Sequence, residues 1–325
     1  MLVMDGRAQT TRRDSVRQRV HEQAVRIDSL LAERNRRGNY DTSYIGRPQG
    51  RLTLKLRTNV SGSSFRVKGE RNGMEGGSDV STDHKATLSV GASYRGLSIG
   101  LALNPAKLAG RSKDYELNLN AYSNRYGLDV VYQASQTLSG TVTINDEEFF
   151  MPKGVMDMKM LTVNGYYAFN GRRFSYPAAF TQSYVQRRSA GSWLVGFSFL
   201  GGSMTAGEKR SERMPDYRIY VGHLGLGGGY GYNLVLGRHW LLHLSALPTL
   251  VVSNRNNIKV DGDRRHMATK FPDLILAERA AIVRNFGTKY FAGGTLVMTN
   301  SLLGDKDIDI NYRKWRTRLF LGYRL

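Results

Sequence analysis

The chain has 325 residues with no Cys, 36 Gly, 7 Pro and 18 Tyr, and its 47 Lys and Arg against 27 Asp and Glu give a net charge of +20. No segment approaches the roughly 18 consecutive apolar residues of a transmembrane helix, which excludes a helical membrane protein. Many Tyr and Gly favour short strands over helices. The basic excess suits nucleic acid, an anionic membrane surface or anionic solutes, and charge alone does not choose among them.

The first 46 residues are predicted to form a separate N-terminal unit. Residues 1–4 are too short for the apolar core of a secretory signal, and Asp5 follows at once. Gly6 and Ala8 are small residues of the kind that signal peptidase prefers, so we expect residues 1–9 to be the remnant of a truncated signal whose true start lies upstream. Residues 14–36 carry apolar side chains at helical spacing. We expect a short periplasmic helix there that packs locally, with docking on a partner or plugging of a barrel mouth as alternatives.

From residue 47 onward, apolar side chains recur at every second position. In the first such stretch, Leu52, Leu54 and Leu56 alternate with polar or basic residues. This alternation is typical of a strand with one apolar and one polar face. Similar stretches occupy residues 52–57, 88–94, 97–103, 115–121, 128–134, 161–169, 193–199, 224–236, 240–246, 274–286, 290–300 and 315–325. The sequence thus predicts about twelve strands.

Short and long connections alternate along this series. Tight turns are expected at 95–96, 124–125, 237–238 and near 287, and long loops at 61–84, 135–157, 201–216 and 253–272. A soluble β-sandwich does not require short and long connections to alternate, whereas a barrel in a bilayer has its short turns on one side and its long loops on the other. A lipid-exposed sheet must also close, because unpaired backbone groups are costly in hydrocarbon. We therefore predict an all-β, antiparallel transmembrane β-barrel over residues 47–325, with its C-terminus in the periplasm.

The last stretch places Trp315, Leu319, Leu321, Tyr323 and Leu325 on one face and arginines on the other. It resembles the closing strand of outer-membrane barrels, which the barrel-insertion machinery recognises, although Leu325 stands where a terminal Phe is usual. The first and last strands adjoin when a barrel closes, so one basic wall is expected in the lumen, at Arg51, Lys55, Arg57, Arg316 and Arg318. An aromatic girdle is expected at Trp193, Trp240, Trp315 and Tyr323.

One periplasmic connection, residues 171–190, is far longer than a turn. It is aromatic and basic through Arg172, Arg173, Tyr176, Phe180, Tyr184, Arg187 and Arg188. With Tyr-Ala-Phe-Asn before it and Gly-Ser-Trp after it, the segment resembles a signature of an uncharacterised domain-of-unknown-function family of outer-membrane proteins from Bacteroidetes-type bacteria. The resemblance extends more loosely from residue 40 to the C-terminus. It implies a barrel and an outer-membrane address and lends no catalytic residue or substrate. The segment is expected to be a structural cap, with a partner-docking site as the alternative.

His243 and Ser245 are the strongest candidates for catalysis. A base and a nucleophile on one strand face lie side by side, as in outer-membrane lipases. In the predicted register, however, both face the lumen, and the sequence names no third group to orient the histidine. We expect a polar lumen pair rather than an enzyme. The other histidines lack ligand spacing, so no metal or cofactor is expected. Glycines at 225–231 are expected to leave lumen space for bulky groups or an inserted segment.

Three functions remain in order of preference. The first is a passive pore or transport-related barrel whose basic lumen favours anions. The second is a non-conducting structural or assembly barrel that binds a periplasmic partner through residues 171–190. The third is a lipid-modifying hydrolase. Outer-membrane lipid, lipopolysaccharide and the barrel-insertion machinery are expected partners. Nucleic acid is not, because the arginines alternate with lipid-facing leucines.

Overall fold

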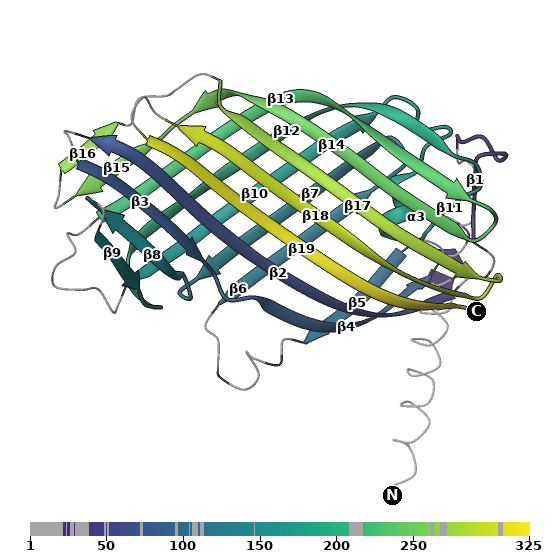
Figure 1. The fold of residues 1–325 in the computed structure, drawn as a ribbon. Coiled ribbons are helices and arrows are strands. Elements are labelled where there is room, and N and C mark those ends of the chain that lie inside the picture. The colour runs from purple at the N-terminus through teal and green to yellow at the C-terminus, as the bar shows by residue number, and fades with distance from the viewer. Residues whose placement is uncertain are drawn as a thin grey trace, which may run out of the picture.

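The computed structural model describes residues 39–48, 50, 52–71, 74–94, 97–103, 114–145, 147–207, 217–260, 263–266, 272–304 and 308–325, and positions 22, 23, 25, 26, 29, 105 and 110. The helix predicted over residues 14–36 falls largely outside this set, although its described positions are helical. Arg51 of the expected basic wall also falls outside it. The remainder is an antiparallel sheet curled into a barrel (Figure 1).

Twelve of the described strands make the barrel wall. They are β2 (Leu52–Arg71), β4 (Lys85–Tyr94), β5 (Leu97–Leu103), β6 (Tyr115–Tyr122), β7 (Tyr126–Ser135), β10 (Met156–Ala168), β12 (Ala190–Ala206), β13 (Tyr217–Leu236), β14 (Trp240–Asn254), β17 (Leu274–Phe286), β18 (Tyr290–Gly304) and β19 (Ile308–Arg324). Antiparallel ladders join them in the order β5, β4, β2, β19, β18, β17, β14, β13, β12, β10, β7 and β6. The predicted antiparallel barrel of about twelve strands is confirmed.

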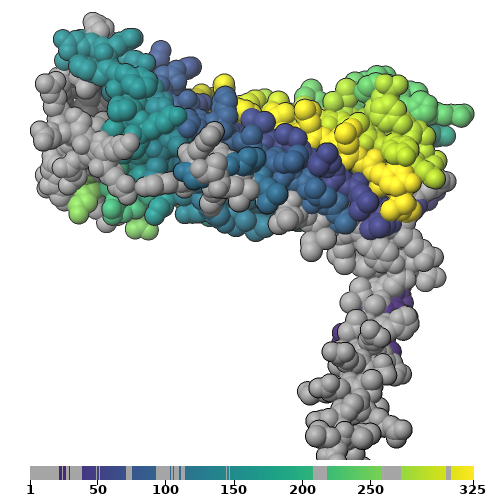
Figure 2. Space-filling model, turned by 90° about the horizontal axis from the view of Figure 1, so that it is seen from below, coloured from purple at the N-terminus to yellow at the C-terminus, as the bar shows by residue number. Residues whose placement is uncertain are grey.

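The first and last wall strands pair as expected. The ladder between β19 and β2 runs from Ile308, opposite Gly69, to Arg324, opposite Thr53. The space-filling view shows the yellow residues of β19 beside the purple-blue residues of β2 (Figure 2). Hydrogen bonds across the interior also join β19 to β6 and β2 to β7. The sheet therefore curls until its two ends face one another.

The barrel has two different ends. At the turn end, tight connections join β6 to β7, β13 to β14 and β17 to β18, and the chain finishes at Leu325. At the loop end, the wall is extended by β3 (Met74–Ser81), β8 (Ser139–Ile144), β9 (Glu147–Met151), β15 (Asn257–Val260) and β16 (Asp263–His266). The stretches 61–84, 135–157 and 253–272 were expected to be loops, and this part of the prediction was wrong. These hairpins have polar residues on both faces, so they lack the alternation that identifies a half-apolar strand.

The distribution of apolar side chains is reversed relative to a soluble protein. Leu244, Leu319 and Leu321 on the outer face are 70%, 61% and 60% exposed, whereas the inward Gln133 and Arg279 are 1% exposed. An apolar outside around a polar inside suits lipid around the wall. The sheet is thus a transmembrane barrel. Among the described residues, no helix is long and apolar enough to cross a membrane.

The four aromatic residues expected in a girdle all lie on the outer face. Trp193, Trp240 and Tyr323 lie near the turn end of β12, β14 and β19, and Trp315 lies farther along β19. Trp193 packs edge-on against Tyr230, with ring centroids 5.2 Å apart. Amphipathic rings at this level suit the border between hydrocarbon and headgroups.

The lipid-facing wall predicts that a charged substitution costs more stability in the middle of β14 than near its loop end. Leu244→Arg is expected to lower the unfolding free energy in vesicles by about 2–4 kcal/mol, because it places a cation in hydrocarbon. Val252→Arg, on the same outer face but near the loop end of β14, is expected to cost about 0–1 kcal/mol. Reversible guanidinium unfolding in vesicles measures both losses. Equal losses would contradict a bilayer around the middle of β14.

Candidate functional site

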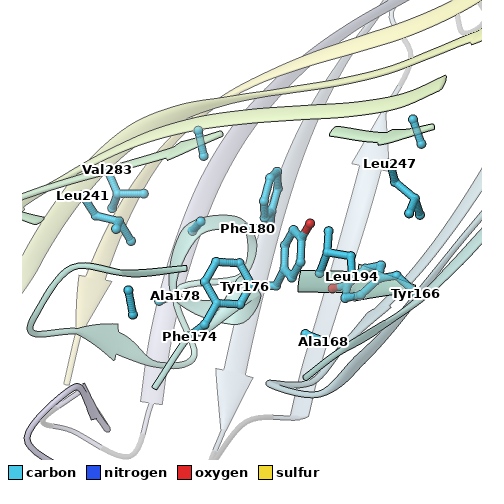
Figure 3. Packing of buried hydrophobic residues seen from close by; sticks show 14 of the residues in the cluster. Tyr166, Ala168, Phe174, Tyr176, Ala178, Phe180, Leu194, Leu241, Leu247 and Val283 are labelled. Atoms are coloured by element: carbon cyan, nitrogen blue, oxygen red, sulfur yellow. The ribbon is translucent and has the colours of Figure 1, made fainter. Parts of the chain in front are cut away.

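Residues 170–190, named here the plug segment, fold into the turn end of the barrel. The segment contains α3 (Tyr176–Phe180), whose N-cap Ser175 accepts a hydrogen bond from the backbone nitrogen of Ala178 at 3.3 Å. Phe174 and Tyr176 are fully buried, and Phe180 is 5% exposed. Their rings point into the barrel toward side chains of the wall (Figure 3). An apolar stopper therefore fills the turn end.

The stopper is fixed to the wall through Asn233 on β13. The Asn233 side-chain amide donates to the carbonyl of Ser175 at 3.0 Å and to Oε1 of Gln186 at 2.9 Å. Its oxygen lies 2.7 Å from Nδ1 of His243, which stands directly opposite on β14. Nε2 of His243 lies 3.0 Å from Oγ of Ser245. A continuous polar chain thus runs from the plug segment to the wall.

Asn233 is the third group that the sequence analysis did not find. The tight turn at 237–238 sets residue 233 opposite residue 243, so hairpin register was the available signal. Serine, histidine and asparagine in this order are a hydrolase arrangement. Here, however, His243 and Ser245 are each 3% exposed, and the histidine packs against the rings of Tyr176 and Phe180. The described contacts make this group an anchor for the plug segment.

The N-terminal linker is joined to the plug segment outside the barrel mouth. The two-residue strands β1 (Ile45–Gly46) and β11 (Val185–Gln186) pair, and the backbone nitrogen of Arg187 donates to the carbonyl of Tyr44 at 2.7 Å. The nitrogen of Asp41 donates to the carbonyl of Arg172 at 2.8 Å. Hydrogen bonds from the hydroxyl and the backbone of Ser43 lower the pKa of Asp41, helped by nearby Arg173. Residues 39–48 and the plug segment together are named the cap.

The outer surface of the cap is basic. Arg172, Arg173, Arg187 and Arg188 are exposed. The guanidinium of Arg47 lies 3.7 Å from the centroid of the Tyr184 ring. In the described part of the cap, the only ion pair is Arg173 with Asp41, at 3.4 Å. The seven residues predicted on this segment therefore divide: Tyr176 and Phe180 point into the barrel, Tyr184 lies at the border, and the arginines face outward.

A buried ion pair crosses the lumen beyond the stopper. Nη2 of Arg279 on β17 lies 2.6 Å from Oδ2 of Asp129 on β7, and both residues are at most 2% exposed. The amide of Asn120 donates to the same carboxylate at 2.6 Å, and the hydroxyl of Tyr122 also donates to it. The guanidinium lies 5.3 Å from the centre of the Tyr166 ring. Asp129 neutralises the charge of Arg279, while Nε and Nη1 of Arg279 are buried and have no hydrogen-bond partner among the described residues.

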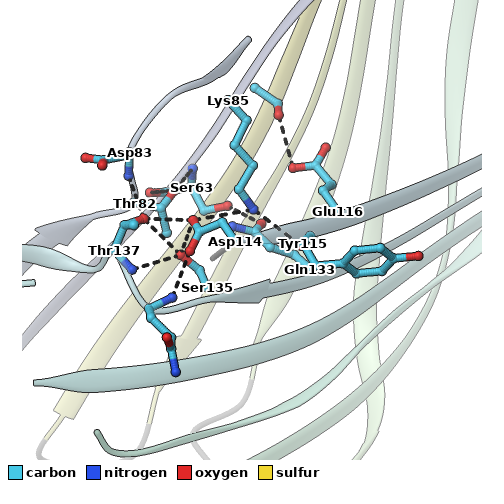
Figure 4. A network of polar contacts seen from close by, with 12 residues as sticks. Ser63, Thr82, Asp83, Lys85, Asp114, Tyr115, Glu116, Gln133, Ser135 and Thr137 are labelled. Carbon is cyan, nitrogen blue, oxygen red and sulfur yellow. Dashed lines mark hydrogen bonds and ion pairs between the residues drawn. The ribbon is translucent and has the colours of Figure 1, made fainter. Parts of the chain in front are cut away.

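A second polar layer lies toward the loop end. Nζ of Lys314 contacts Glu116 at 2.7 Å and Gln133 at 2.8 Å. Beside this layer, Asp114 accepts hydrogen bonds from Ser135 at 2.6 Å and Thr137 at 2.8 Å (Figure 4). Farther along lies a second buried apolar cluster that includes Phe65, Met158, Ile275 and Tyr312. Side chains of the described residues therefore cross the lumen at several levels.

The basic wall lies between the stopper and the Lys314 layer. Lys55 and Arg57 of β2 face inward beside Arg316 and Arg318 of β19. Lys55 donates to the carbonyl of Thr181, at the end of α3. The two expected members on β19 donate to amide oxygens: Arg316 to Asn118 and Asn120, and Arg318 to Asn59 at 2.7 Å.

Arg324, which the sequence analysis put on the same strand face but not in the wall, donates to Asn285 at 3.1 Å. None of these five cations has a carboxylate ion pair within the described part of the chain. The same region contains no group of three His, Asp or Glu side chains that could hold a metal ion.

These features define a transmembrane β-barrel whose lumen holds an apolar stopper and buried ion pairs. The chain belongs to the family described as Domain of unknown function (DUF4421), whose model matches residues 39–325. No curated protein matches it.

Several solved barrels are similar in structure. The outer membrane protease OmpT from Escherichia coli shows 8% identity over 86% of this chain and 97% of its own, with a TM-score of 0.42. The translocator domain of the autotransporter NalP from Neisseria meningitidis shows 11% identity over 96% and 98%, with a TM-score of 0.28. The outer membrane protein OprG from Pseudomonas aeruginosa shows 13% identity over 86% and 97%, with a TM-score of 0.25. At these scores we infer no activity from the likeness.

The buried ion pair generates a stability prediction. Asp129→Asn is expected to lower the unfolding free energy by about 3–5 kcal/mol, because it leaves the charge of Arg279 buried without a counter-charge. Adding Arg279→Gln removes that charge, so the double variant is expected to lose less than Asp129→Asn alone. Denaturant unfolding of the refolded barrel measures the losses of Asp129→Asn, of Arg279→Gln and of the double variant.

The matched control is Asp79→Asn. It breaks the exposed pair in which Asp79 lies 2.7 Å from Arg66, and it is expected to cost less than about 1 kcal/mol. A double variant that loses the sum of the single losses would show that Asp129 and Arg279 are not coupled.

Proposed function

We propose that this chain is a non-conducting outer-membrane barrel whose cap docks a periplasmic protein through an acidic surface. One observation carries the proposal. The same segment seals the lumen with its aromatic rings and presents four exposed arginines on its outer side. Arg173 and Arg187 also hold the linker, through Asp41 and the carbonyl of Thr42, and their exposed side chains remain on the periplasmic side of the cap.

The chemistry of the cap suits a protein partner. Arginine is enriched at protein interfaces, where its planar group forms paired hydrogen bonds with carboxylates. The backbone under these arginines is held by the pairing of β1 with β11, which reduces the ordering cost of binding. Net positive charge also raises the association rate with an acidic partner.

The proposal also includes a location in the outer membrane. An apolar belt around the wall suits outer-membrane lipid and lipopolysaccharide, and β19 supplies an alternating strand for the barrel-insertion machinery. With the turn end in the periplasm, the cap faces that compartment. The Bacteroidetes-type source stays an expectation from the family resemblance. We assign no catalytic step, because the Ser245 hydroxyl lies beneath the rings of the plug segment.

Site-specific photo-crosslinking tests the docking proposal. The chain has no Cys, so Arg172→Cys gives a single attachment point on the cap for a benzophenone label. In intact envelopes we expect an adduct whose crosslinked peptide is rich in Asp and Glu. The yield is expected to fall several-fold when Arg187→Gln and Arg188→Gln are added or when the salt concentration is raised, because both weaken exposed charge pairs.

A label at Lys153, exposed on the loop-end side, is the matched control and is expected to give no such adduct. No adduct from position 172, or one unaffected by removing the two charges, would refute docking through the arginines.

The basic wall favours a second candidate, a passive anion-selective pore. It lacks carboxylate partners among the described residues, and cationic linings select for anions. Conduction through this barrel requires displacement of the stopper.

Planar-bilayer recordings separate the two functions. We expect the refolded full-length protein to carry no steady current, because side chains cross its described lumen. A variant that lacks residues 1–46 loses part of the cap, and we expect at most brief openings from it. Heat-modifiable migration in electrophoresis is the control for folding. Steady anion-selective current from the full-length barrel would replace the first proposal with the pore.

A further inference from the structure

We propose that the barrel interior contains a binding chamber for a phosphate-like oxyanion, held by Arg57 and Arg318. The chamber is the part of the lumen between the stopper and the Lys314 layer, on the side of β2, β6 and β19. The proposal requires neither conduction nor docking at the cap.

The first observation is a local excess of positive charge. Lys55, Arg57, Arg316, Arg318 and Arg324 face one side of the lumen. Their described partners are a carbonyl, amide oxygens and, for Lys55 and Arg324, the ring of Phe291. The carboxylates inside the described lumen have partners elsewhere. Asp129 pairs with Arg279, and Glu116 pairs with Lys314. None of the five forms an ion pair with a described carboxylate, and clustered cations shielded from bulk water need a counter-charge.

The second observation is that two of these cations and their neighbours on β6 are partly exposed. Inward residues on the stopper side are buried, as for His243 at 3% and Val283 at 1% exposed. Arg57 and Arg318 also point inward but are only partly buried. Every inward residue of β6 is likewise only partly buried. The inward side chains beside these cations are therefore less tightly covered than those around the stopper.

The neighbouring strand β4 contributes little bulk to this space. Ser89 stands directly opposite Arg57 in the ladder, and Gly91 stands opposite Lys55. Toward the loop end, the chamber is bounded by the contact between Lys314 and Glu116. Toward the turn end, it is bounded by the bond from Lys55 to the carbonyl of Thr181.

The third observation is unused hydrogen-bond donors. Nε of Arg57 is buried and has no acceptor among the described residues. Arg318 uses its Nε for Asn59, and its two terminal nitrogens make no bond to a described residue. A guanidinium group binds two oxygens of one anion in parallel, so two such groups match phosphate or sulfate better than a monatomic ion.

The experiment uses the refolded full-length barrel in detergent without phosphate. Inorganic phosphate is titrated at fixed ionic strength in chloride, and binding is followed by calorimetry and by the thermal midpoint. Wild type is expected to bind saturably and to gain stability. Arg57→Gln and Arg318→Gln are each expected to bind about tenfold or more weakly, the loss typical of removing one charged hydrogen-bond donor.

Two controls separate binding from folding and from surface charge. Without phosphate, both variants are expected to unfold at or above the wild-type temperature, because each removes a cation from a repulsive cluster. Arg66→Gln makes the same change on the exposed part of β2, next to Asp79, and is expected to bind phosphate like wild type. Equal binding by all four proteins, or no saturable binding by wild type, would overturn the proposal.

A second arm identifies the source of the oxyanion. Competition by a short-chain phosphatidylglycerol would identify a lipid headgroup as the bound phosphate. Absence of competition, with phosphate still bound, would identify a free oxyanion.

Discussion

The pairing of polar groups across the lumen is the constraint on which this molecule depends. The wall strands direct most of their apolar residues toward lipid, so hydrophobic burial inside the barrel is limited to two clusters, one around the plug segment and one toward the loop end. The inward groups must satisfy one another instead. The contact between Arg279 and Asp129 shows how this is done, because it joins two strands that lie far apart in the sheet. Such bonds fix the curvature of the sheet as well as neutralising charge, since only a strongly curled wall brings these partners together.

The plug segment completes an apolar cluster that the wall also lines at the turn end. Phe174, Tyr176 and Phe180 bring into the barrel the kind of surface that the strands direct outward. Their fit depends on small residues in the wall. A Cβ at Gly231 would lie 3.1 Å from the ring of Phe174, tighter than ordinary van der Waals contact. Gly231 thus makes room for the inserted segment, whereas a Cβ at Gly227 or Gly229 would instead meet backbone carbonyls of β14.

Most of the wall could be predicted from the sequence, because alternation and turn parity are local properties. Trp315 and Leu319 face outward while Arg316 and Arg318 face inward, and this alternation alone places β19 between lipid and lumen. The adjacency of β2 and β19 followed from closure rather than from any motif. The hairpins at the loop end were missed because solvated strands need no apolar face. Asn233 was missed because its role depends on its pairing with His243, ten residues farther along the chain, and on the carbonyl of Ser175 in the plug segment.

Lys55 links the basic wall to the stopper, which no local pattern indicated. Its ammonium group contacts the carbonyl of Thr181, where α3 ends and a backbone acceptor is left over. A cation placed there satisfies that acceptor and has a favourable interaction with the partial negative charge of the helix end. The same group stands within the cluster of Arg57, Arg318 and Arg324, where like charges oppose it. The bond from Lys55 to Thr181 therefore depends on the position of the stopper and on the charge balance of the lumen. A change in either one affects the other through Lys55.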